Sequence, residues 1–310
     1  MNINQTTNSD DFTISFFDLF LRIKQNIYLF FIIFLIIVTL SFVYAISIKN
    51  VYKSEALIQP NLSSAGIQNQ LNSSFGGLQS IAGISFGSEV SDTQNIIEKI
   101  QSKDFFNELV KNNDMLLPNL IAIDSYDFTN QKISYDKNIF NDEKKEWVRK
   151  PKSSIIKAIP TYLEGHYYYK KALTIYPKNK TNMIYISIEH ISPAFAHSFL
   201  SDILSTADKL YRNEDFKESS MAINYARNEY NKYNYKTIKD SISNIIDSQL
   251  KIQMSTQINS EYKFKTIDKP YYPEKKSKPN RTLIIIIGFF IGLLFSTSMT
   301  ILYSFVKLKK

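Results

Sequence analysis

The sequence predicts an α+β membrane protein in which two transmembrane helices flank one domain that holds a small mixed sheet near the membrane and a very long α-helix. Three observations carry this prediction. Residues 27–48 and 283–306 contain no charged residue over 22 and 24 positions. Short segments of alternating polarity follow the first run and precede the second. Between them, residues 194–269 contain neither glycine nor proline over 76 positions.

Both uncharged runs are long enough to cross a bilayer. At a helical rise of ~1.5 Å per residue they reach roughly 33 and 36 Å, against a hydrocarbon core of ~30 Å. The first run has one alternative, because the small residues around Ala45-Ile46-Ser47 resemble a signal-peptide cleavage site. Its apolar run exceeds the ~7–15 residues of such peptides, so two uncleaved spans are predicted. Both termini then lie on one side and residues 49–282 form a single domain on the other.

Charge alone leaves the side of that domain open. Basic residues near the span ends are more numerous in the central domain than in the termini, which taken alone places the domain in the cytoplasm. That rule weakens for loops longer than ~60 residues, which translocate largely regardless of their charge. The absence of cysteine fits an oxidising compartment as well as a cytosolic one.

Five segments predict a small sheet and an amphipathic helix. Residues 51–58 and 183–189 alternate in polarity and read as strands, the second of them paired with residues 172–176. Residues 261–267 read as a strand that returns the chain toward the second span. Residues 92–112 place isoleucine, phenylalanine and leucine on one side and predict an amphipathic helix. No clear pattern is found between residues 119 and 170.

The long helix is predicted to start at Ser192-Pro193, because serine is a good N-cap and proline suits the first helical position. The helical region covers about residues 194–256. An uninterrupted helix of that length is a rod of roughly 90 Å. A bend is expected near residues 212–219.

The sequence contains one motif that resembles a catalytic site. Gly83-Ile84-Ser85-Phe86-Gly87 matches the G-x-S-x-G elbow of serine hydrolases. The elbow requires a strand before it and an oxyanion loop elsewhere, and this chain has small residues before the motif and no HGGG-type stretch. A chance match in a glycine-rich loop is favoured, and a membrane-anchored hydrolase using Ser85 is the enzyme-class alternative.

No other pattern predicts catalysis, a cofactor or a metal. His166, His190 and His197 lack the close spacing of metal motifs, and no G-x-x-x-x-G-K-[ST] nucleotide loop occurs. The formal charge of +8 raises nucleic acid as a partner. Much of that charge lies in residues 263–281 beside a span, where contact with anionic headgroups is the simpler interpretation. No nucleic-acid binding is predicted.

The strip formed by residues 269–281 joins the domain directly to the second span. Pro270, Pro273 and Pro279 are separated by multiples of three, so they share one face of a polyproline II helix. Such a segment is stiff, which predicts a spacer that ends with Arg281 at the membrane surface.

Small residues repeat every four positions in the second span, at Gly288, Gly292, Ser296 and Thr300. A ridge of this kind lets helices approach closely, so Gly288 and Gly292 are predicted packing positions. The alternative is that glycine is common in transmembrane helices without a packing role.

Several stretches together resemble a known family. After the first span come VYKSEALIQP, then GGLQSIAGISFGS, then IIEKIQSKDFFNELV. The chain closes with P-x-x-P-x-x-x-x-x-P-x-R entering a glycine-containing span. This order resembles the polysaccharide chain-length determinant proteins, or polysaccharide co-polymerases of the Wzz type, over most of residues 13–306. The match is weakest at residues 115–170.

The resemblance implies an inner-membrane protein whose bulk is periplasmic. Its expected parts are a cytoplasmic segment 1–26, transmembrane helix 27–48, periplasmic domain 49–282, transmembrane helix 283–306 and cytoplasmic tail 307–310. A larger branch of the family adds a kinase domain with a nucleotide loop. That activity is not expected here, because the loop motif is missing and four residues follow Val306.

The resemblance also implies a function without catalysis. Members form homo-oligomers and set the chain length of lipopolysaccharide O-antigen or a related glycan, beside a separate membrane-bound polymerase. A lipid-linked glycan is a further expected partner, and no cofactor is implied. The same architecture would serve a co-polymerase or export component of an exopolysaccharide or capsule system, which stays the alternative.

Overall fold

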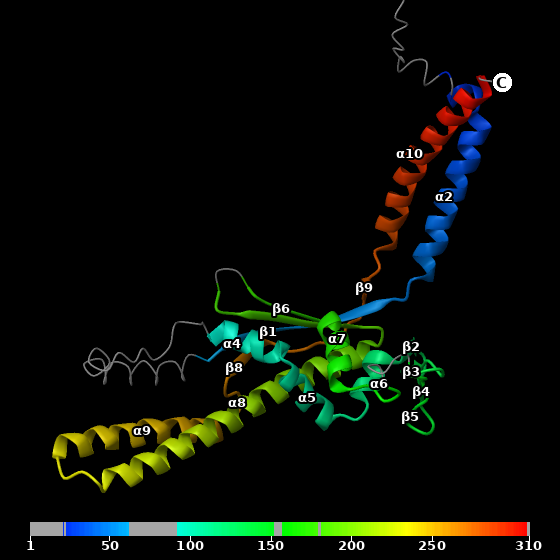
Figure 1. Cartoon of the computed structure of the whole chain (residues 1–310). Coiled ribbons are helices and arrows are strands. Elements are labelled where there is room, and N and C mark those ends of the chain that lie inside the picture. Colours follow the sequence, from blue (N-terminus) through cyan, green and yellow to red (C-terminus); the bar gives the residue numbers. More distant parts are fainter. Residues whose placement is uncertain (1–20, 22, 62–91, 152–156, 179–180, 309–310) are drawn as a thin grey trace, which may run out of the picture. The chain divides into compact units, whose positions relative to one another are not determined.

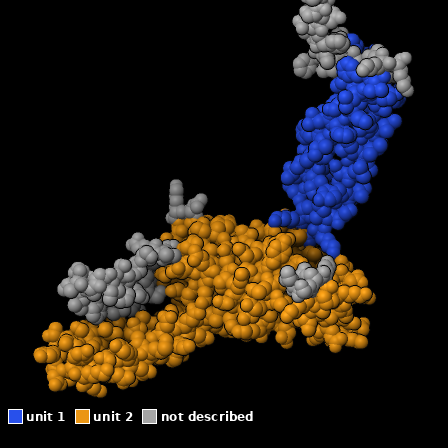
Figure 2. All heavy atoms as spheres, in the orientation of Figure 1, with its two compact units in different colours: residues 1–50, 278–310 blue, residues 51–277 orange. Residues whose placement is uncertain are grey.

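The computed structural model of the chain describes residues 21, 23–61, 92–151, 157–178 and 181–308. The chain divides into two compact units, one made of residues 1–50 and 278–310 and the other of residues 51–277 (Figure 2).

The first unit is a pair of helices, α2 (Ile27–Ser47) and α10 (Arg281–Leu308), packed side by side. Both are long and apolar enough to cross a membrane. Large apolar side chains such as Leu35, Phe42 and Leu294 are exposed on the pair, at 66%, 51% and 66%. A helix that exposes apolar side chains in this way suits a hydrocarbon environment, and these two helices coincide with the predicted spans.

The second unit is built on a five-stranded sheet with β1 (Val51–Pro60) at its centre (Figure 1). β1 pairs with β7 on one side and β8 on the other, both antiparallel, and β6 pairs antiparallel with β7. The short strand β9 also pairs with β1. The predicted strands are confirmed as β6 (Leu173–Pro177), β7 (Ile184–His190) and β8 (Phe264–Asp268), with β9 (Lys276–Lys278) added.

Strand alternation places the core on one face of this sheet. In β1 the residues Ser54, Ala56 and Ile58 are buried while their neighbours are half-exposed. In β7 the core residues include Ile184 and Ile186, both fully buried. Most of the remaining apolar core comes from the helices α4 (Asp92–Gln101), α5 (Lys103–Asn112) and α8 (Pro193–Tyr230), and Leu116, Leu120 and Tyr169 add to it (Figure 1). Alternation with a period of two produces this result because successive side chains of a strand point to opposite faces.

The predicted helix over residues 92–112 is in fact two helices, α4 (Asp92–Gln101) and α5 (Lys103–Asn112). The break has a local cause at Ser102. Its backbone is extended and its hydroxyl accepts a hydrogen bond from the Phe105 backbone N–H at 3.1 Å, so it caps a new helix. Both helices bury their apolar sides, so the apolar residues keep helical spacing across the break. That spacing is why the sequence pattern predicts one helix.

The region in which the sequence shows no pattern contains short elements. The helix α6 (Leu116–Ile121) leads into two antiparallel hairpins, and α7 follows them. These elements are β2 (Ile123–Asp127), β3 (Lys132–Tyr135), β4 (Phe140–Asn141), β5 (Glu146–Trp147) and α7 (Tyr162–Ala172). Arg149 fastens the hairpins to α7, because its guanidinium donates to both carboxylate oxygens of Glu164 at 2.5 and 2.7 Å. Strands this short are too brief to give a readable period.

The long helix α8 (Pro193–Tyr230) starts as predicted, with the Ser192 hydroxyl accepting from the Phe195 N–H at 3.2 Å. The expected bend near residues 212–219 is wrong, because α8 runs through that region without interruption. The chain instead reverses at residues 231–235, and α9 (Lys236–Ile258) packs back along α8 (Figure 1). The 38 residues of α8 span about 57 Å, so a hairpin replaces the predicted rod of 90 Å. The reversal lets α9 partly cover apolar side chains, among them Ile245 and Leu250, which are half-buried.

Arg212 fixes the foot of this hairpin. Its guanidinium donates to the carbonyl oxygens of Thr256 and, at 2.8 Å, of Asn259, where α9 ends. It also donates to the Asp208 carboxylate at 2.6 Å, and the other oxygen of Asp208 accepts from the Tyr262 backbone N–H at 2.9 Å. Arg212 thereby gives hydrogen-bond partners to two carbonyls at the end of α9, which lack partners within the helix. Asp208 fixes the start of the segment that leads to β8.

His190 closes the junction between β7 and α8. Its Nδ1 accepts from the Ser192 backbone N–H at 3.1 Å, so Nε2 carries the proton and donates to the Asn119 carbonyl at 2.9 Å. Burial lowers the pKa of His190 to about 4, against the opposing effect of these hydrogen bonds. The ring is therefore neutral at pH 7.

Candidate functional site

Arg281 joins the two membrane helices at one end. It is the first residue of α10, and its Nε donates to the Ala45 carbonyl in the last turn of α2 at 3.1 Å. Its Nη2 donates to the Asn50 side-chain oxygen, also at 3.1 Å. The last carbonyls of a helix have no partner within the helix and carry partial negative charge. A guanidinium that bonds one of them both satisfies the backbone and fixes the spacing of the helix pair.

At Gly288 the two helices approach closely. A Cβ atom built on Gly288 would lie 2.1 Å from the Ser41 Oγ and 2.4 Å from the Ser41 Cβ. Rotation of the Ser41 side chain could move its oxygen but not its Cβ. Only glycine fits this position while α2 and α10 keep their separation.

The same face of α10 continues with small and hydroxyl-bearing residues. At Gly292 a Cβ would lie 3.4 Å from side-chain atoms of Ile37 and Phe34, a contact that is tight but tolerable. Ser296 and Thr300 are completely buried on this face. The four-residue repeat predicted from the sequence is therefore turned toward the first span of the same chain.

The hydroxyl groups on this face are satisfied inside their own helix. Ser296 donates to the Leu293 carbonyl at 3.1 Å, and Thr300 donates to the Ser296 carbonyl at 2.7 Å. A polar group in hydrocarbon must find such a partner or cost several kcal/mol. These residues therefore act as small apolar spacers toward α2.

The proline strip lies along the sheet instead of standing free. The Ser54 hydroxyl of β1 donates to the Tyr271 carbonyl at 2.7 Å, and Pro273 is buried. Residues 276–278 form β9, paired with β1. The predicted uninterrupted polyproline II spacer is wrong for this reason, since strand pairing supplies hydrogen bonds that polyproline II lacks.

An ion pair on β1 faces the start of the strip. Lys53 and Glu55 form a salt bridge, and Lys53 lies 3.4 Å from the Tyr185 hydroxyl. The hydrogen bond to Glu55 raises the pKa of Lys53, with burial opposing it. Burial also acts against the charged form of Glu55, but hydrogen bonds from Lys53, Tyr185 and Tyr271 together hold the pKa of that carboxyl below its usual range. Both groups are charged at pH 7 and contribute polar contacts to the strip.

The six predicted residues do not form one site. Pro279, Arg281, Gly288 and Gly292 belong to the unit of the two spans, and Pro270 and Pro273 belong to the sheet unit. Within the first unit, Arg281 and the two glycines all contact α2.

Sequence reasoning missed the partners of these residues on the first span. Ser41 packs against Gly288. The Ala45 carbonyl and the Asn50 side-chain oxygen accept hydrogen bonds from Arg281. The spacing of Ser41 and Ala45, two small residues four apart in an apolar run, was the signal that could have identified them.

The remaining candidates are the Ser85 motif and the histidines. The motif around Ser85 lies outside the described residues. His166 lies 2.9 Å from the Gln101 carbonyl, and His190 is structural. Across the described ranges, no cluster of histidine and carboxylate side chains could hold a metal ion. The residues described in this subsection position helices and strands relative to each other.

These features define a membrane-anchored α+β protein whose two spans pack on each other. Residues 13–113 match the family model described as chain length determinant protein (Wzz). A solved structure described as "full-length bacterial polysaccharide co-polymerase" is similar over 94% of this chain and 98% of that chain, with 13% identity and a TM-score of 0.44. No match is found among curated proteins.

The match to the chain length determinant (Wzz) family model covers the N-terminal third of the chain. The resemblance stated from the sequence is thereby confirmed. The matched residues contain the first candidate span, α2, and the central strand of the sheet, β1. They also contain the helices α4 and α5.

Proposed function

We propose that the chain is a non-enzymatic regulator of surface polysaccharide chain length. It acts as a homo-oligomeric co-polymerase of the inner membrane on lipopolysaccharide O-antigen or a related glycan, beside a separate polymerase. The observation that carries the proposal is the family match over residues 13–113 in a chain with two candidate spans. The paired spans and the strip on β1 serve to hold the domain, and no bond-making step is assigned to the chain.

The proposal includes a topology in which both termini are cytoplasmic and residues 49–282 are periplasmic. It is supported by the two spans at the chain's ends. A reporter that is active only in the periplasm should be silent when fused after Lys310 or before Phe12. The same reporter inserted near Asn130 should be active, and the reverse pattern would refute this topology.

The central experiment compares surface glycans from cells with and without the chain on a gel that resolves polymer length. Deletion should broaden or shorten the length distribution while total polymer persists, because the polymerase is a separate protein. Loss of all polymer would instead make the chain part of the synthetic machinery. A change confined to exopolysaccharide or capsule would assign it to those systems.

A further inference from the structure

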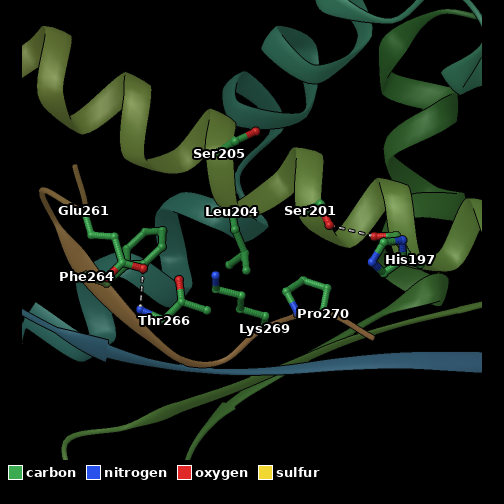
Figure 3. Close-up of a pocket in the computed structure, with 9 residues that line it drawn as sticks. All are labelled: His197, Ser201, Leu204, Ser205, Glu261, Phe264, Thr266, Lys269 and Pro270. Atoms are coloured by element: carbon green, nitrogen blue, oxygen red, sulfur yellow. Dashed lines mark hydrogen bonds between the residues drawn. The ribbon is translucent and has the colours of Figure 1, made fainter. Parts of the chain in front are cut away.

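An open cleft of about 370 Å³ lies between α8 and the segment that leads from α9 through β8 into the strip (Figure 3). One wall comes from one side of α8, with His197, Ser201 and Ser205 at a spacing of four residues. The other wall comes from Glu261, Thr266, Lys269 and neighbouring residues. This volume lies at the lower end of the ~300–1,000 Å³ range of ligand sites. We call it the α8 cleft.

The floor of the α8 cleft is a small apolar surface. Leu204 and Phe264 are largely buried, and Pro270 is half-exposed beside them. Figure 3 shows the Leu204 side chain and the Pro270 ring turned into the gap between the two walls.

The walls present both donors and acceptors. Ser201 and Ser205 donate their hydroxyl protons to the carbonyls of His197 and Asp202, at 3.0 and 3.1 Å, so their oxygens keep lone pairs for a ligand. Glu261 accepts from the Thr266 backbone N–H at 3.0 Å and adds carboxylate lone pairs.

Three polar side chains of the cleft have no partner in the part of the chain that the structure describes. These are the His197 ring, the Thr266 hydroxyl and the Lys269 ammonium. The ammonium supplies donors, while the ring and the hydroxyl each supply a donor and an acceptor. Together with Ser201 and Ser205 they line the α8 cleft (Figure 3).

The mixture of groups indicates the class of ligand. A sugar hydroxyl donates and accepts at once, so a saccharide needs acceptors such as Glu261 beside donors such as Lys269. An inorganic anion would need donors alone, and Glu261 would repel it. An acyl chain would leave every wall group unpaired, which costs free energy at each of them.

We infer that the α8 cleft is a saccharide-binding site that takes one or two sugar rings of the glycan, with ring faces on the floor and hydroxyls on the walls. The inference rests on the proposed function, because it deepens the partnership with the glycan into a place on this chain. Since the cleft is open to solvent, a polymer can enter it by an internal segment as well as by an end.

The test measures binding by the full-length protein in lipid nanodiscs. The probe is a set of short oligosaccharides, released by mild acid from the surface polysaccharide of the cells that produce the chain. Saturation-transfer NMR detects contact, and titration gives the affinity. Thr266→Val with Lys269→Met removes two wall groups at nearly constant volume. Ser201→Trp fills the cleft, and Thr174→Val, at an exposed position of β6, is the matched control.

The wild type and the Thr174→Val control should bind equally. The double variant should lose about tenfold in affinity, the loss of roughly one hydrogen bond to a charged group, and Ser201→Trp should abolish binding. Circular dichroism shows which variants are folded. If Ser201→Trp does not fold, the affinity of the Thr266→Val/Lys269→Met variant alone tests the inference. Equal binding by the double variant, no binding by the wild type, or binding of inorganic phosphate in place of the oligosaccharides would overturn the inference.

The two proposals fail in different ways. If deletion of the chain leaves the glycan length distribution unchanged, the regulatory function is wrong, and the binding experiment still decides the cleft by itself. If deletion changes the distribution while the cleft variants bind and regulate like the wild type, only the cleft is wrong.

Discussion

Replacing Gly288 with alanine should separate the two spans, although alanine is a small residue and a good helix former. The added Cβ would lie 2.4 Å from the Ser41 Cβ, whereas carbon atoms in contact are normally ~3.5–4.0 Å apart. The helices must therefore move apart by roughly 1 Å at this point, which is the difference between the 2.4 Å separation and a normal carbon–carbon contact. Overpacking of this kind costs about 1–3 kcal/mol.

Three further variants separate the clash from other effects. Ser41→Gly in the Gly288→Ala background leaves the Ser41 Cα, 3.9 Å away, as the nearest atom of that residue, so it should restore packing. Ser41→Ala keeps the Cβ and should not restore it. Gly292→Ala alone should be nearly neutral, because its new contacts begin at 3.4 Å.

The measurement uses the natural absence of cysteine in the chain. Cysteines introduced at Phe34 and Phe289, whose rings lie 5.2 Å apart in an edge contact, report the separation through a short bifunctional crosslinker. Crosslinking should fall in Gly288→Ala and return with Ser41→Gly. Unchanged crosslinking in Gly288→Ala, or rescue by Ser41→Ala as complete as that by Ser41→Gly, would refute the reasoning.

Three other predictions concern the sheet unit. Proline at Ala226, buried inside α8, should cost ~3 kcal/mol and open the α8–α9 hairpin, while proline at Asn234 in the connection should be tolerated; circular dichroism and limited proteolysis compare them. Arg212→Met should lower the free energy of unfolding by about 2–4 kcal/mol and speed hydrogen exchange at the Tyr262 amide. Unchanged exchange would mean that the Arg212–Asp208 ion pair does not stabilise this end of the hairpin. The pKa of His190 is lower in the folded state, so its contribution to stability is complete above pH 6.5 and is lost as the pH falls toward 4. The free energy of unfolding should drop by about 3 kcal/mol over that range, and His190→Gln should lack this part of the dependence.

The sequence predicted the elements whose signal is local. The spans, β1, β7 and the start of α8 at Ser192 follow from apolar length, alternation and a serine cap, and these depend only on neighbours in the chain. The break at Ser102 was missed because the apolar period continues across it.

The elements that the sequence did not predict depend on distant partners. The reversal at residues 231–235 contains no glycine or proline, and it occurs because α9 gains a surface on α8 that no local rule describes. The strip was given the wrong conformation because β1, which lies more than 200 positions earlier in the chain, supplies its partner. In the span pair, the glycine ridge was readable, but its partner Ser41 required knowledge of which helix it faces.

The place of β1 in the sheet has a consequence for the order in which the protein folds. Among the described strands β1 is synthesised first, but its two long neighbours come much later, with Pro60 opposite Phe264 at a separation of roughly 200 residues. At ~5–20 residues per second, synthesis of the intervening chain takes on the order of 10–40 s. Until β7 has been synthesised neither edge of β1 is paired, and the edge that pairs with β8 stays unpaired for the whole interval. Unpaired edges favour aggregation. The sheet therefore closes only after β8 and β9 have been synthesised.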